Sequence, residues 1–465
     1  MAQQIESCKS ELDLFHTLPI NNSIQSSHYV FHTPKVSPTD NDKKFEIEFE
    51  TPNYIDLNDI YLQYDAKIRK EFTNDTTNLR ERKFEDKLDI GPINNLIHSL
   101  FREVELTLTK NKIPVTVENT NRYDYKAYLI NLLNYSEDAK NGWLRNGLFI
   151  KDSQGEFDTV TTKDEANVKS DQTSLNLTFD DDNKKISSVV SNINHSFIKR
   201  REELFANNGN LRLISPIQLD LFKSNRLLKN GVNLKFNLVM NDPGFYLMGK
   251  ETSCEILVKN IGIWARHCVI NPDIVNAHDE AIKISPTKYP LRTVRIKSFQ
   301  ISKEESGSIK TFELSAITPN KIIMGFLNDQ AYTGNLSKNP FNFVSDNIKK
   351  VTVSVESYKK EVEVNRYDGD YMEGYHSLCE SLNWYGSNKS PITRDEYNKG
   401  NFLFGFNLNA DKGCVDQFNP TKTQGNVKIS ISTKESNEPI RLILMSEYDN
   451  QLNIGDEKIY FNYNT

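Results

Sequence analysis

The sequence predicts an all-β protein built from two antiparallel β domains in tandem. Two observations support this prediction: apolar side chains alternate with polar ones in many short segments, and such segments are about equally frequent in the two halves. The chain has 465 residues and a mass of 53.6 kDa, which is too long for one ordinary domain and suits two or three. Only 37% of the residues are hydrophobic, against about 45–50% in typical globular chains. A core can still form because these residues are sharply patterned.

Alternation with period two marks strands that bury one face and leave the other in water. The predicted strands of the first half are 45–49, 62–68, 104–108, 175–179 and 232–238, and those of the second half are 351–355, 402–408, 427–431 and 459–463. Half-buried strands of this kind suit antiparallel sandwiches better than parallel sheets that are covered on both faces.

Helical spacing of apolar residues is limited to four short stretches. They are 93–101 directly after Gly91-Pro92, 125–133 with Asn121 as a cap upstream, 274–282 and 371–382. Each half therefore carries many strands and about two short helices, which suggests two similar domains although no residue-level repeat is visible.

The domain boundary is predicted at the turn cluster 241–244, directly after the strand 232–238. The first domain would then cover 36–243 and the second 244–465. Residues 1–35 are unpatterned and are expected to form an N-terminal arm that orders only against another surface. Residues 152–210 have few apolar positions and are expected to form a long surface excursion between strands.

Composition excludes several classes of function. The formal net charge of −6 argues against a protein whose main function is to bind nucleic acid. The apolar runs are far shorter than the ~20 residues of a membrane helix, and the N-terminus does not read as a secretory signal. The cysteines are odd in number and scattered, which indicates synthesis in a reducing, intracellular compartment. They are Cys8, Cys254, Cys268, Cys379 and Cys414.

Signals of catalysis and of bound phosphate are close to absent. Gly249-Lys250 lacks the upstream glycine of a phosphate loop and is followed by Glu251 rather than Ser or Thr. The chain contains neither a Gly-x-Ser-x-Gly elbow nor a His-Glu-x-x-His helix. We therefore predict no enzyme activity, no catalytic residues and no cofactor.

Metal sites are not predicted either. His267-Cys268 with Cys254, and His376 with Cys379, are the soft-ligand neighbours, but their spacing matches no common zinc finger or ribbon. The acidic run 180–182 lacks the glycine and the terminal glutamate of a calcium loop. A buried cysteine on a helix stripe and a solvated loop tip are the simpler interpretations.

Two basic clusters have simple interpretations as solvated surface. The run 199–201 is followed at once by Glu202-Glu203, so the local charge nearly cancels. Arg292, Arg295 and Lys297 share one face of an alternating strand and could meet nucleic acid, but an exposed strand face explains them as well.

Longer strings, taken in order, resemble one protein family. They are SELDLF at 10–15, YIDLNDIYLQYDAKI at 54–68, INNLIHSLFREVELTL at 93–108, YDYKAYLINLLNYS at 123–136, LLKNGVNLKFNLV at 227–239, KYPLRTVRIKSFQI at 288–301, IIMGFLNDQAYTGNLSKNPFNF at 322–343, FLFGFNLNAD at 402–411, QGNVKISI at 424–431 and ILMSEYDNQLNI at 443–454. The series is similar to the hexon-like, double jelly-roll major capsid protein of Polinton/Maverick elements and adintovirus-type viruses. It covers nearly the whole chain and is weakest over 152–210. The block 339–343 and the unit 93–108 are its most specific parts.

The resemblance implies two tandem eight-stranded antiparallel jelly rolls with short helices and long inter-strand loops. It implies a homotrimer whose six jelly rolls form a pseudo-hexameric capsomer of an icosahedral, virus-like shell, with 152–210 as a tower on the outer face. Its partners would be neighbouring capsomers, a single jelly-roll penton protein and minor capsid proteins. Contact with the genome would fall to other proteins. The location would be the virion capsid, after synthesis in host cytoplasm or nucleus.

Two other classes of function stay open at this point. A carbohydrate-binding or glycosidase-like β-sandwich would need paired carboxylates at strand ends facing an aromatic-lined cleft. A cellular scaffold derived from such an element would keep the fold without the particle. Particles visible by electron microscopy after expression would separate a shell protein from both.

The fold should be indifferent to metal chelators and to reductants, because no ligand set and no cysteine pair in the sequence supports it. We expect the melting temperature of the purified protein to stay unchanged when EDTA or a thiol is added. A drop of more than a few degrees with either reagent would contradict this expectation.

Overall fold

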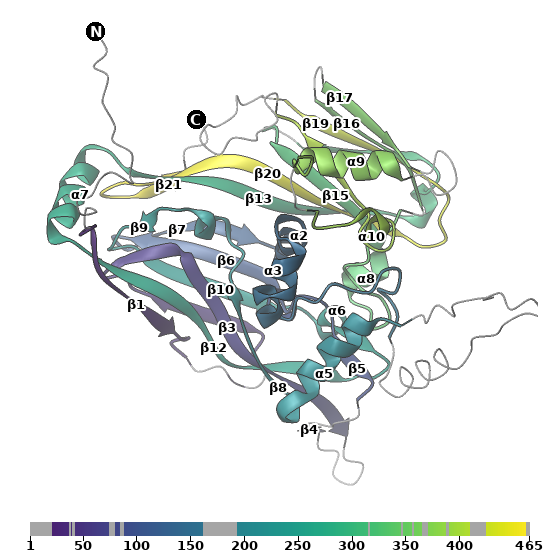
Figure 1. Cartoon of the computed structure of the whole chain (residues 1–465), viewed down its shortest axis with the longest axis horizontal. Helices are drawn as coiled ribbons and strands as arrows, with labels where there is room; N and C mark the ends of the chain where they lie inside the picture. Colours follow the sequence, from purple (N-terminus) through teal and green to yellow (C-terminus); the bar gives the residue numbers. More distant parts are fainter. Residues whose placement is uncertain are drawn as a thin grey trace, which may run out of the picture.

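The structure is a computed structural model (Figure 1). It describes residues 21–36, 39, 42–73, 80–83, 88–160, 193–314, 317–345, 347–355, 358–364, 371–386, 390–409 and 425–461. Antiparallel sheets dominate, and they form two sandwiches that lie side by side with short helices between and around them (Figure 1).

The first sandwich contains two sheets that together hold eight principal strands. One sheet has the order β1 (Ile24–His32), β12 (Cys254–Ile270) and β3 (Tyr54–Thr73), with β8 (Asn210–Pro216) also paired to β3. The facing sheet has the order β2 (Lys44–Phe49), β10 (Asn233–Met240), β6 (Phe101–Lys110) and β7 (Ile113–Thr120). Counted along the chain, the two orders are 1-8-3-6 and 2-7-4-5, which is the strand order of a jelly roll.

The second sandwich repeats this order. One sheet contains β13 (Thr287–Ile301), β20 (Ile440–Ile454), β15 (Lys321–Asn328) and β18 (Leu403–Asn407), and the other contains β14 (Ile309–Leu314), β19 (Val427–Thr433), β16 (Ile348–Val355) and β17 (Tyr358–Glu363). These orders are again 1-8-3-6 and 2-7-4-5. The chain is therefore two tandem eight-stranded jelly rolls, as predicted.

The remaining elements lie at the sheet edges and in the connections. The short strands are β4 (Arg80–Lys83), β5 (Ile90–Pro92), β9 (Leu227–Leu228), β11 (Leu247–Gly249) and β21 (Ile459–Phe461). The helices are α1 (Leu96–Ser99), α2 (Tyr123–Asn134), α3 (Glu137–Asn141), η2 (Trp143–Gly147), α5 (His195–Gly209), η3 (Asp220–Lys223), α6 (Pro243–Tyr246), α7 (Pro272–Ile284), η4 (Lys303–Glu305), α8 (Asp329–Thr333), α9 (Met372–Ser381) and α10 (Arg394–Tyr397).

The core of each roll forms where the alternating residues of neighbouring strands come into register. Phe236 of β10 pairs with Ile47 of β2 on one side and with Leu106 of β6 on the other. In the second roll, Val351 and Ile431 pair across β16 and β19. These side chains are fully buried, and each contributes about 1.5–3 kcal/mol by leaving water.

Most predicted elements are confirmed. Strands occur at all the predicted places except 175–179, which lies outside the described residues. The helices at 125–133 and 371–382 are confirmed as α2 and α9. The stretch 93–101 forms only the single turn α1, because β6 begins at its last residue. The helix at 274–282 forms as α7, but Ile282 is its only buried residue, so its apolar stripe does not mark a core.

The predicted domain limits need correction. The turn at 241–244 lies inside the first roll, because β12 pairs with β3 and β1 and is the eighth strand of that roll. The predicted arm 1–35 contains β1, the first strand of the roll. Both errors have one cause: a jelly roll places its last strand between its first and third, and local pattern does not report such pairing. We propose that the two domains meet between Ile270 and Thr287, with α7 as the connector.

The predicted excursion 152–210 is also wrong in part. Residues 161–192 lie outside the described residues. After them, α5 buries Phe197, Arg200 and Leu204 against the first roll and leads directly into β8. The pattern was missed because a charged residue, Arg200, occupies one of the buried positions.

A fragment that ends at residue 243 should fail to fold, because it lacks β12, the central strand of its sheet. A fragment that ends at residue 285 keeps all eight strands of the first roll and should unfold cooperatively in urea. Far-UV circular dichroism and solubility of the two fragments check this expectation. A soluble, cooperatively folded 1–243 fragment would contradict the boundary proposed above.

Candidate functional site: the junction between the two jelly rolls

Helix α2 is the element that brings the two rolls together (Figure 1). It lies in the connection between β7 and β8, and its Tyr125 and Tyr128 face the second roll. The Tyr128 ring stacks on Phe341 with centroids 3.9 Å apart and planes at 1°. Tyr125 meets the same Phe341 edge-on at 5.7 Å and Phe343 at 6.5 Å. The block 339–343, singled out in the sequence, therefore supplies the aromatic surface on which α2 packs.

A guanidinium group sits between aromatic rings at the start of α2. Arg122 lies 4.1 Å from the centroid of Tyr332 and 4.8 Å from that of Phe245. It pairs with the fully buried Asp124 at 3.0 Å, which also accepts a hydrogen bond from Asn241 at 3.0 Å. Burial raises the pKa of Asp124, and Arg122 opposes that rise. The cation is thus held by both charge and ring contacts.

Tyr332 of α8 has a second guanidinium on it. Arg441 of β20 lies 4.4 Å from the ring centroid and pairs with Asp329 at 2.5 Å. The Tyr332 ring is therefore shared between Arg122 from the first roll and Arg441 from the second. This arrangement fixes the position of α8 relative to α2.

A buried charge cluster lies along the same helix. Lys126 is fully buried and pairs with Glu118 of β7 and with Asp220 of η3, the latter at 2.7 Å. Asp220 also accepts a hydrogen bond from the backbone N–H of Val294, in β13 of the second roll, at 2.8 Å. Burial alone would lower the pKa of Lys126, but Asp220 and Glu118 outweigh it and raise that pKa. The charge cluster of the first roll is therefore tied to the sheet of the second.

One end of the junction is closed by lysines and a close glycine contact. Lys151 pairs with Glu396 of the second roll at 2.7 Å, and Lys140 donates to the carbonyl of Pro391 at 2.6 Å. Burial, reinforced by the charge of Lys151, lowers the pKa of Lys140 to about 8. Gly400 has φ +103°, and a Cβ there would come within 2.3 Å of the Phe157 ring.

The opposite end is held by polar contacts to the backbone. Lys110 donates to the carbonyl of Gly455 at 2.7 Å, and Asn111 donates to that of Asp456 at 3.1 Å. The hydroxyl of Tyr289 donates to the carbonyl of Leu227 at 3.2 Å. The contacts between the two rolls thus run from one end of the rolls to the other.

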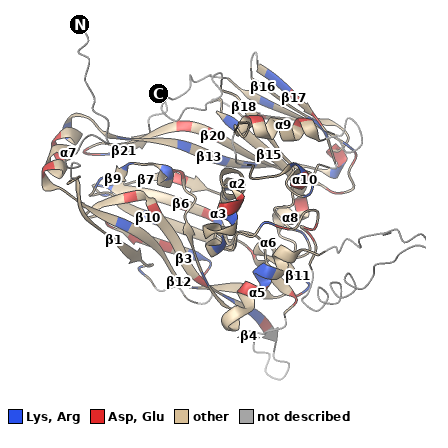
Figure 2. Cartoon of the chain, in the orientation of Figure 1, with Lys and Arg blue, Asp and Glu red and all other residues tan. Residues whose placement is uncertain are grey.

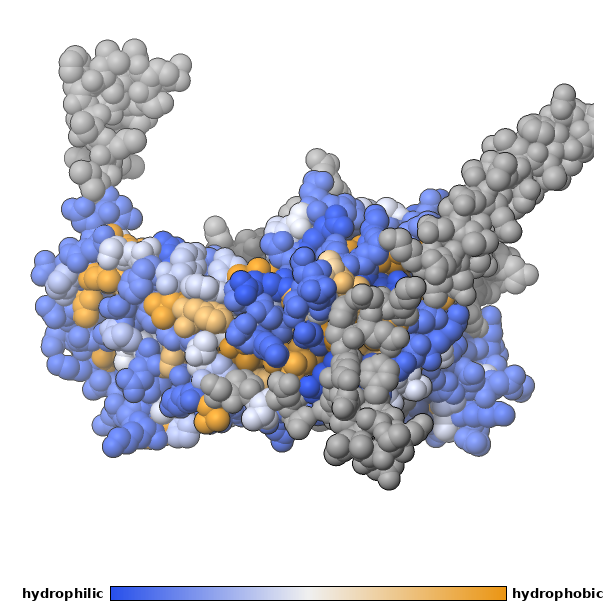
Figure 3. All heavy atoms as spheres, turned by 90° about the horizontal axis from the view of Figure 1, so that it is seen from below, coloured by the Kyte–Doolittle hydropathy of each residue, from blue (hydrophilic) through white to orange (hydrophobic). Residues whose placement is uncertain are grey.

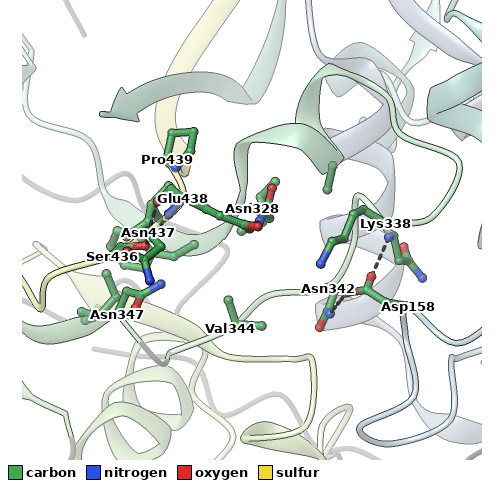
Figure 4. Close-up of a pocket in the computed structure, with 16 residues that line it drawn as sticks. Asp158, Asn328, Lys338, Asn342, Val344, Asn347, Ser436, Asn437, Glu438 and Pro439 are labelled. Carbon is green, nitrogen blue, oxygen red and sulfur yellow. Dashed lines mark hydrogen bonds between the residues drawn. The ribbon is translucent and has the colours of Figure 1, made fainter. Parts of the chain in front are cut away.

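A polar cavity of about 510 Å³ lies at one end of this junction (Figure 4). Asp158 projects into it from the first roll and accepts from the backbone N–H of Asn339 at 2.7 Å and from the Asn342 amide at 3.0 Å. On the other side, Glu438 accepts a hydrogen bond from Asn328. Among the described residues, no His or Cys lines the cavity. The carboxylates of Asp158 and Glu438 accept hydrogen bonds that link segments distant in the sequence.

The residues considered as metal ligands do not come together. Cys254 and Cys268 lie near opposite ends of β12, roughly 45 Å apart along an extended strand. Cys379 is buried on α9, and burial raises the pKa of its thiol. His376 contacts the Tyr385 hydroxyl at 2.7 Å. The described part of the chain holds no cluster of three or more His, Cys, Asp or Glu side chains able to hold a metal ion.

The basic clusters take different places from those expected. Arg200 is fully buried, pairs with Asp152 at 2.6 Å and donates to the carbonyl of Ile150. It therefore anchors α5 and is not a solvated charge. Arg292 and Arg295 lie on β13 as predicted, the latter 5.0 Å from the Tyr448 ring centroid. Acidic and basic side chains are interspersed over the molecule (Figure 2).

Several expectations fall on residues outside the described ranges. They concern Cys8, Cys414 and the acidic run 180–182. Within the described ranges, no helix combines the length and the apolar character that crossing a bilayer requires.

The sequence did not predict the roles of Arg122, Lys126 and Asp220, which form buried polar contacts at the junction. The string YDYKAYLINLL gives an apolar helix stripe, and a lysine beside such a stripe is normally read as solvent-exposed. Only the partners brought by β7 and η3 make its burial possible, and they are distant in the sequence.

Comparison with known proteins places this fold among viral structures. No family model matches the chain. It is similar to a chain of the Sputnik virophage structure, with a TM-score of 0.60, 13% identity and coverage of 99% of this chain and 93% of that one. It is also similar to the faustovirus major capsid protein, with a TM-score of 0.53, 9% identity and coverage of 97% and 93%. The mavirus major capsid protein gives a TM-score of 0.51, 11% identity and coverage of 99% and 96%.

A curated relative comes from an animal. The uncharacterized protein F54H12.2 of Caenorhabditis elegans is 22% identical over 421 residues, which is 87% of this chain and 89% of that protein. At these identities the comparisons establish the double jelly-roll fold, which this chain shares with major capsid proteins of viruses.

Replacing Lys126 with Met should lower the free energy of unfolding by about 3–5 kcal/mol, because Glu118 and Asp220 would stay buried without their cation. Burial and Asp220 already raise the pKa of Glu118 above its ordinary value of 4.5. A carboxyl group whose pKa is higher in the folded state than in the unfolded state stabilises the fold at low pH, and this contribution is lost as the pH rises. The deficit should therefore shrink as the pH is lowered from 7 toward 4.5. Urea unfolding at several pH values measures it.

The matched control is Lys297→Met, which removes an exposed lysine and should change stability by less than about 0.5 kcal/mol. The triple variant Lys126→Met, Glu118→Gln, Asp220→Asn should recover most of the loss, because it leaves no unpaired charge. Equal effects of Lys126→Met and Lys297→Met would contradict the role assigned to the cluster.

Proposed function

We propose that this chain is the major capsid protein of an icosahedral, virus-like shell, a structural protein and not an enzyme. The observation that carries the proposal is that two jelly rolls of identical strand order are joined by contacts along their whole length. A shell repeats the same contacts many times, so it needs a building block whose halves do not move relative to each other. The likeness to the faustovirus and mavirus major capsid proteins, over nearly the full length of each chain, supports the same role.

The assembly unit we propose is a homotrimer. Two jelly rolls per chain require three chains to complete a six-sided capsomer. Large apolar side chains remain on the surface of the single chain, and apolar patches lie among hydrophilic residues on the face in Figure 3. The exposed ones include Ile24, Tyr29, Ile113, Ile284, Ile309 and Tyr385. Subunit contacts would remove such groups from water.

The proposed partners follow from this role. They are neighbouring capsomers, a single jelly-roll penton protein and minor capsid proteins. The negative net charge and the mixed charges over the molecule (Figure 2) favour a chain without sequence-specific contact to the genome. The chain would be made in host cytoplasm or nucleus and reside in the virion. The ordered strings of the sequence support a source among Polinton/Maverick elements and adintovirus-type viruses.

A second candidate function is a cellular scaffold that keeps the fold without forming a particle. The relative in Caenorhabditis elegans favours this candidate, because it covers most of both chains and is encoded by an animal. Electron microscopy of the expressed protein separates the two: closed shells or hexagonal tiles support the capsid role, and isolated oligomers support the scaffold.

Light scattering on the purified chain should report a mass of three times 53.6 kDa. Subunits that close a six-sided capsomer are expected to bury well over ~2,000 Å² in total, so the trimer should persist on dilution to nanomolar concentration. A folded monomer at micromolar concentration would remove the capsid proposal. A dimer would be equally damaging, because two-fold symmetry cannot produce a hexagonal footprint from two rolls per chain.

A further inference from the structure

Strand β1 is held in the first roll by a single neighbour. It lies at the end of its sheet and pairs with β12 from Ile24 to His32, and no strand of the described residues pairs with its other edge. Most of its residues are exposed. A strand with few buried contacts opens at low cost, so the few side chains that do pack against the roll decide whether it stays in place.

Three of the side chains at this seam are histidines. His28 is the cross-strand partner of His267, and their rings stack with centroids 5.7 Å apart. The Nε2 atoms of His32 and His267 lie 3.0 Å apart. His32 also stacks on Phe49 of the facing sheet at 3.7 Å, with the planes at 8°. His267 is only 4% exposed. The inner side of the β1 seam is thus a histidine cluster against an aromatic wall.

The charged groups near the seam are engaged elsewhere. On β2, Glu48 pairs with Lys35 on the outer side of its sheet. On β12, Arg266 points to the face opposite His267 and pairs with Asp56 and Asp59. Among the described residues, no carboxylate bonds to any of the three imidazoles. A positive charge on them would therefore have no bonded counter-charge among the described residues.

On the outer face of the seam, Tyr29 donates to Asp59 at 3.1 Å, and Arg266 donates to the Ser27 hydroxyl at 3.2 Å. Of the side-chain types at this seam, imidazole is the one whose unperturbed pKa lies between pH 5 and 8.

We propose that His28, His32 and His267 form an acid-sensitive latch, which holds β1 on β12 at neutral pH and releases it when the imidazoles are protonated. With both rings neutral, His32 and His267 share one N–H···N hydrogen bond. A first added proton must be buried beside Phe49 without a counter-charge. A second leaves two N–H groups facing each other across the 3.0 Å gap, with like charges in contact. The latch is argued from contacts within a single chain and does not rest on the capsid role.

The direction of the pH effect follows from linkage. Burial and the neighbouring His267 lower the pKa of His32 from 6.5 to about 4, and burial together with His28 lowers the pKa of His267. Release of the strand exposes the rings of His32 and His267 to water and restores their ordinary pKa. Protons then favour the released form as the pH falls from 6.5 toward 4. His32 alone shifts the equilibrium by about tenfold at pH 5.5, and His267 adds to this shift.

Release of β1 would uncover the edge of β12 and the side chains behind it. An uncovered edge presents unpaired backbone N–H and C=O groups that another strand can pair with. Acid would therefore open an acceptor edge on the first roll while the second roll stays folded.

Hydrogen exchange of the full chain, measured by mass spectrometry at pH 7.5 and pH 5.5 and corrected for intrinsic exchange, tests the latch. We expect protection of residues 24–32 to fall at least tenfold at pH 5.5. The internal reference is β16 of the second roll, whose protection should change less than twofold. Equal loss in β1 and β16 would mean global acid unfolding and would overturn the proposal. Unchanged protection of β1 would overturn it as well.

Substitutions then assign the effect to the imidazoles. His32→Phe keeps an aromatic ring on Phe49 without a titratable nitrogen, so β1 should keep most of its protection at pH 5.5. The matched control His376→Gln removes a histidine on α9 of the second roll and should keep the full pH response. A His32→Phe response equal to that of the wild type would overturn the latch. If His32→Phe loosens β1 already at pH 7.5, His32→Gln decides, because it keeps a hydrogen-bonding side chain without the titratable ring: an undiminished pH response in that variant overturns the latch, and a reduced response supports it.

Discussion

The arrangement of the two rolls depends on one buried cation, Lys126. Apolar burial holds the rolls together but does not specify their orientation, because it is non-directional. The ammonium group is directional: it needs Glu118 and Asp220 at contact distance, and Asp220 in turn needs the backbone N–H of Val294 in the second roll. Any rotation between the rolls would break the hydrogen bond from Val294 and leave the buried carboxylate of Asp220 without that donor. The aromatic contacts of Arg122 and Tyr332 then pack around an orientation that is already fixed.

Such a junction would suit the capsid role proposed above. A small hinge angle within one subunit would be multiplied over every copy in a closed assembly, so shells of fixed size require stiff building blocks. The structure spreads stiffening contacts over both ends of the junction. Lys140 and Lys151 close one end and Lys110 the other, each by reaching across to the second roll. Two separate sandwiches joined by a simple linker would move relative to each other, whereas these two are in direct contact at both ends of the junction.

The sequence was sufficient for the strands but not for their order. Alternation is local, so β2, β6, β10, β16 and β19 could be predicted from neighbouring residues alone. The place of β12 could not, because its partners β1 and β3 are about 200 residues away. This nonlocal pairing moved the domain boundary and converted part of the predicted arm into a strand. The junction could not be predicted from the sequence either. Lys126 and Arg200 carry charges that normally mark a surface, and only partners from distant segments make their burial possible. The family resemblance supplied the jelly-roll order that periodicity lacked.

The fold tolerates wide changes in sequence. At 13% identity or less, the virus proteins keep the same fold over almost the whole chain, since alternation can be satisfied by many apolar residues. The residues of a buried ion cluster cannot be exchanged as freely, because each charged group needs a partner atom of opposite charge at contact distance. The two rolls of this chain follow the same logic, because they share strand order without a visible sequence repeat. In this protein the sheets define the fold, and the polar groups in the connections define how its two halves are joined.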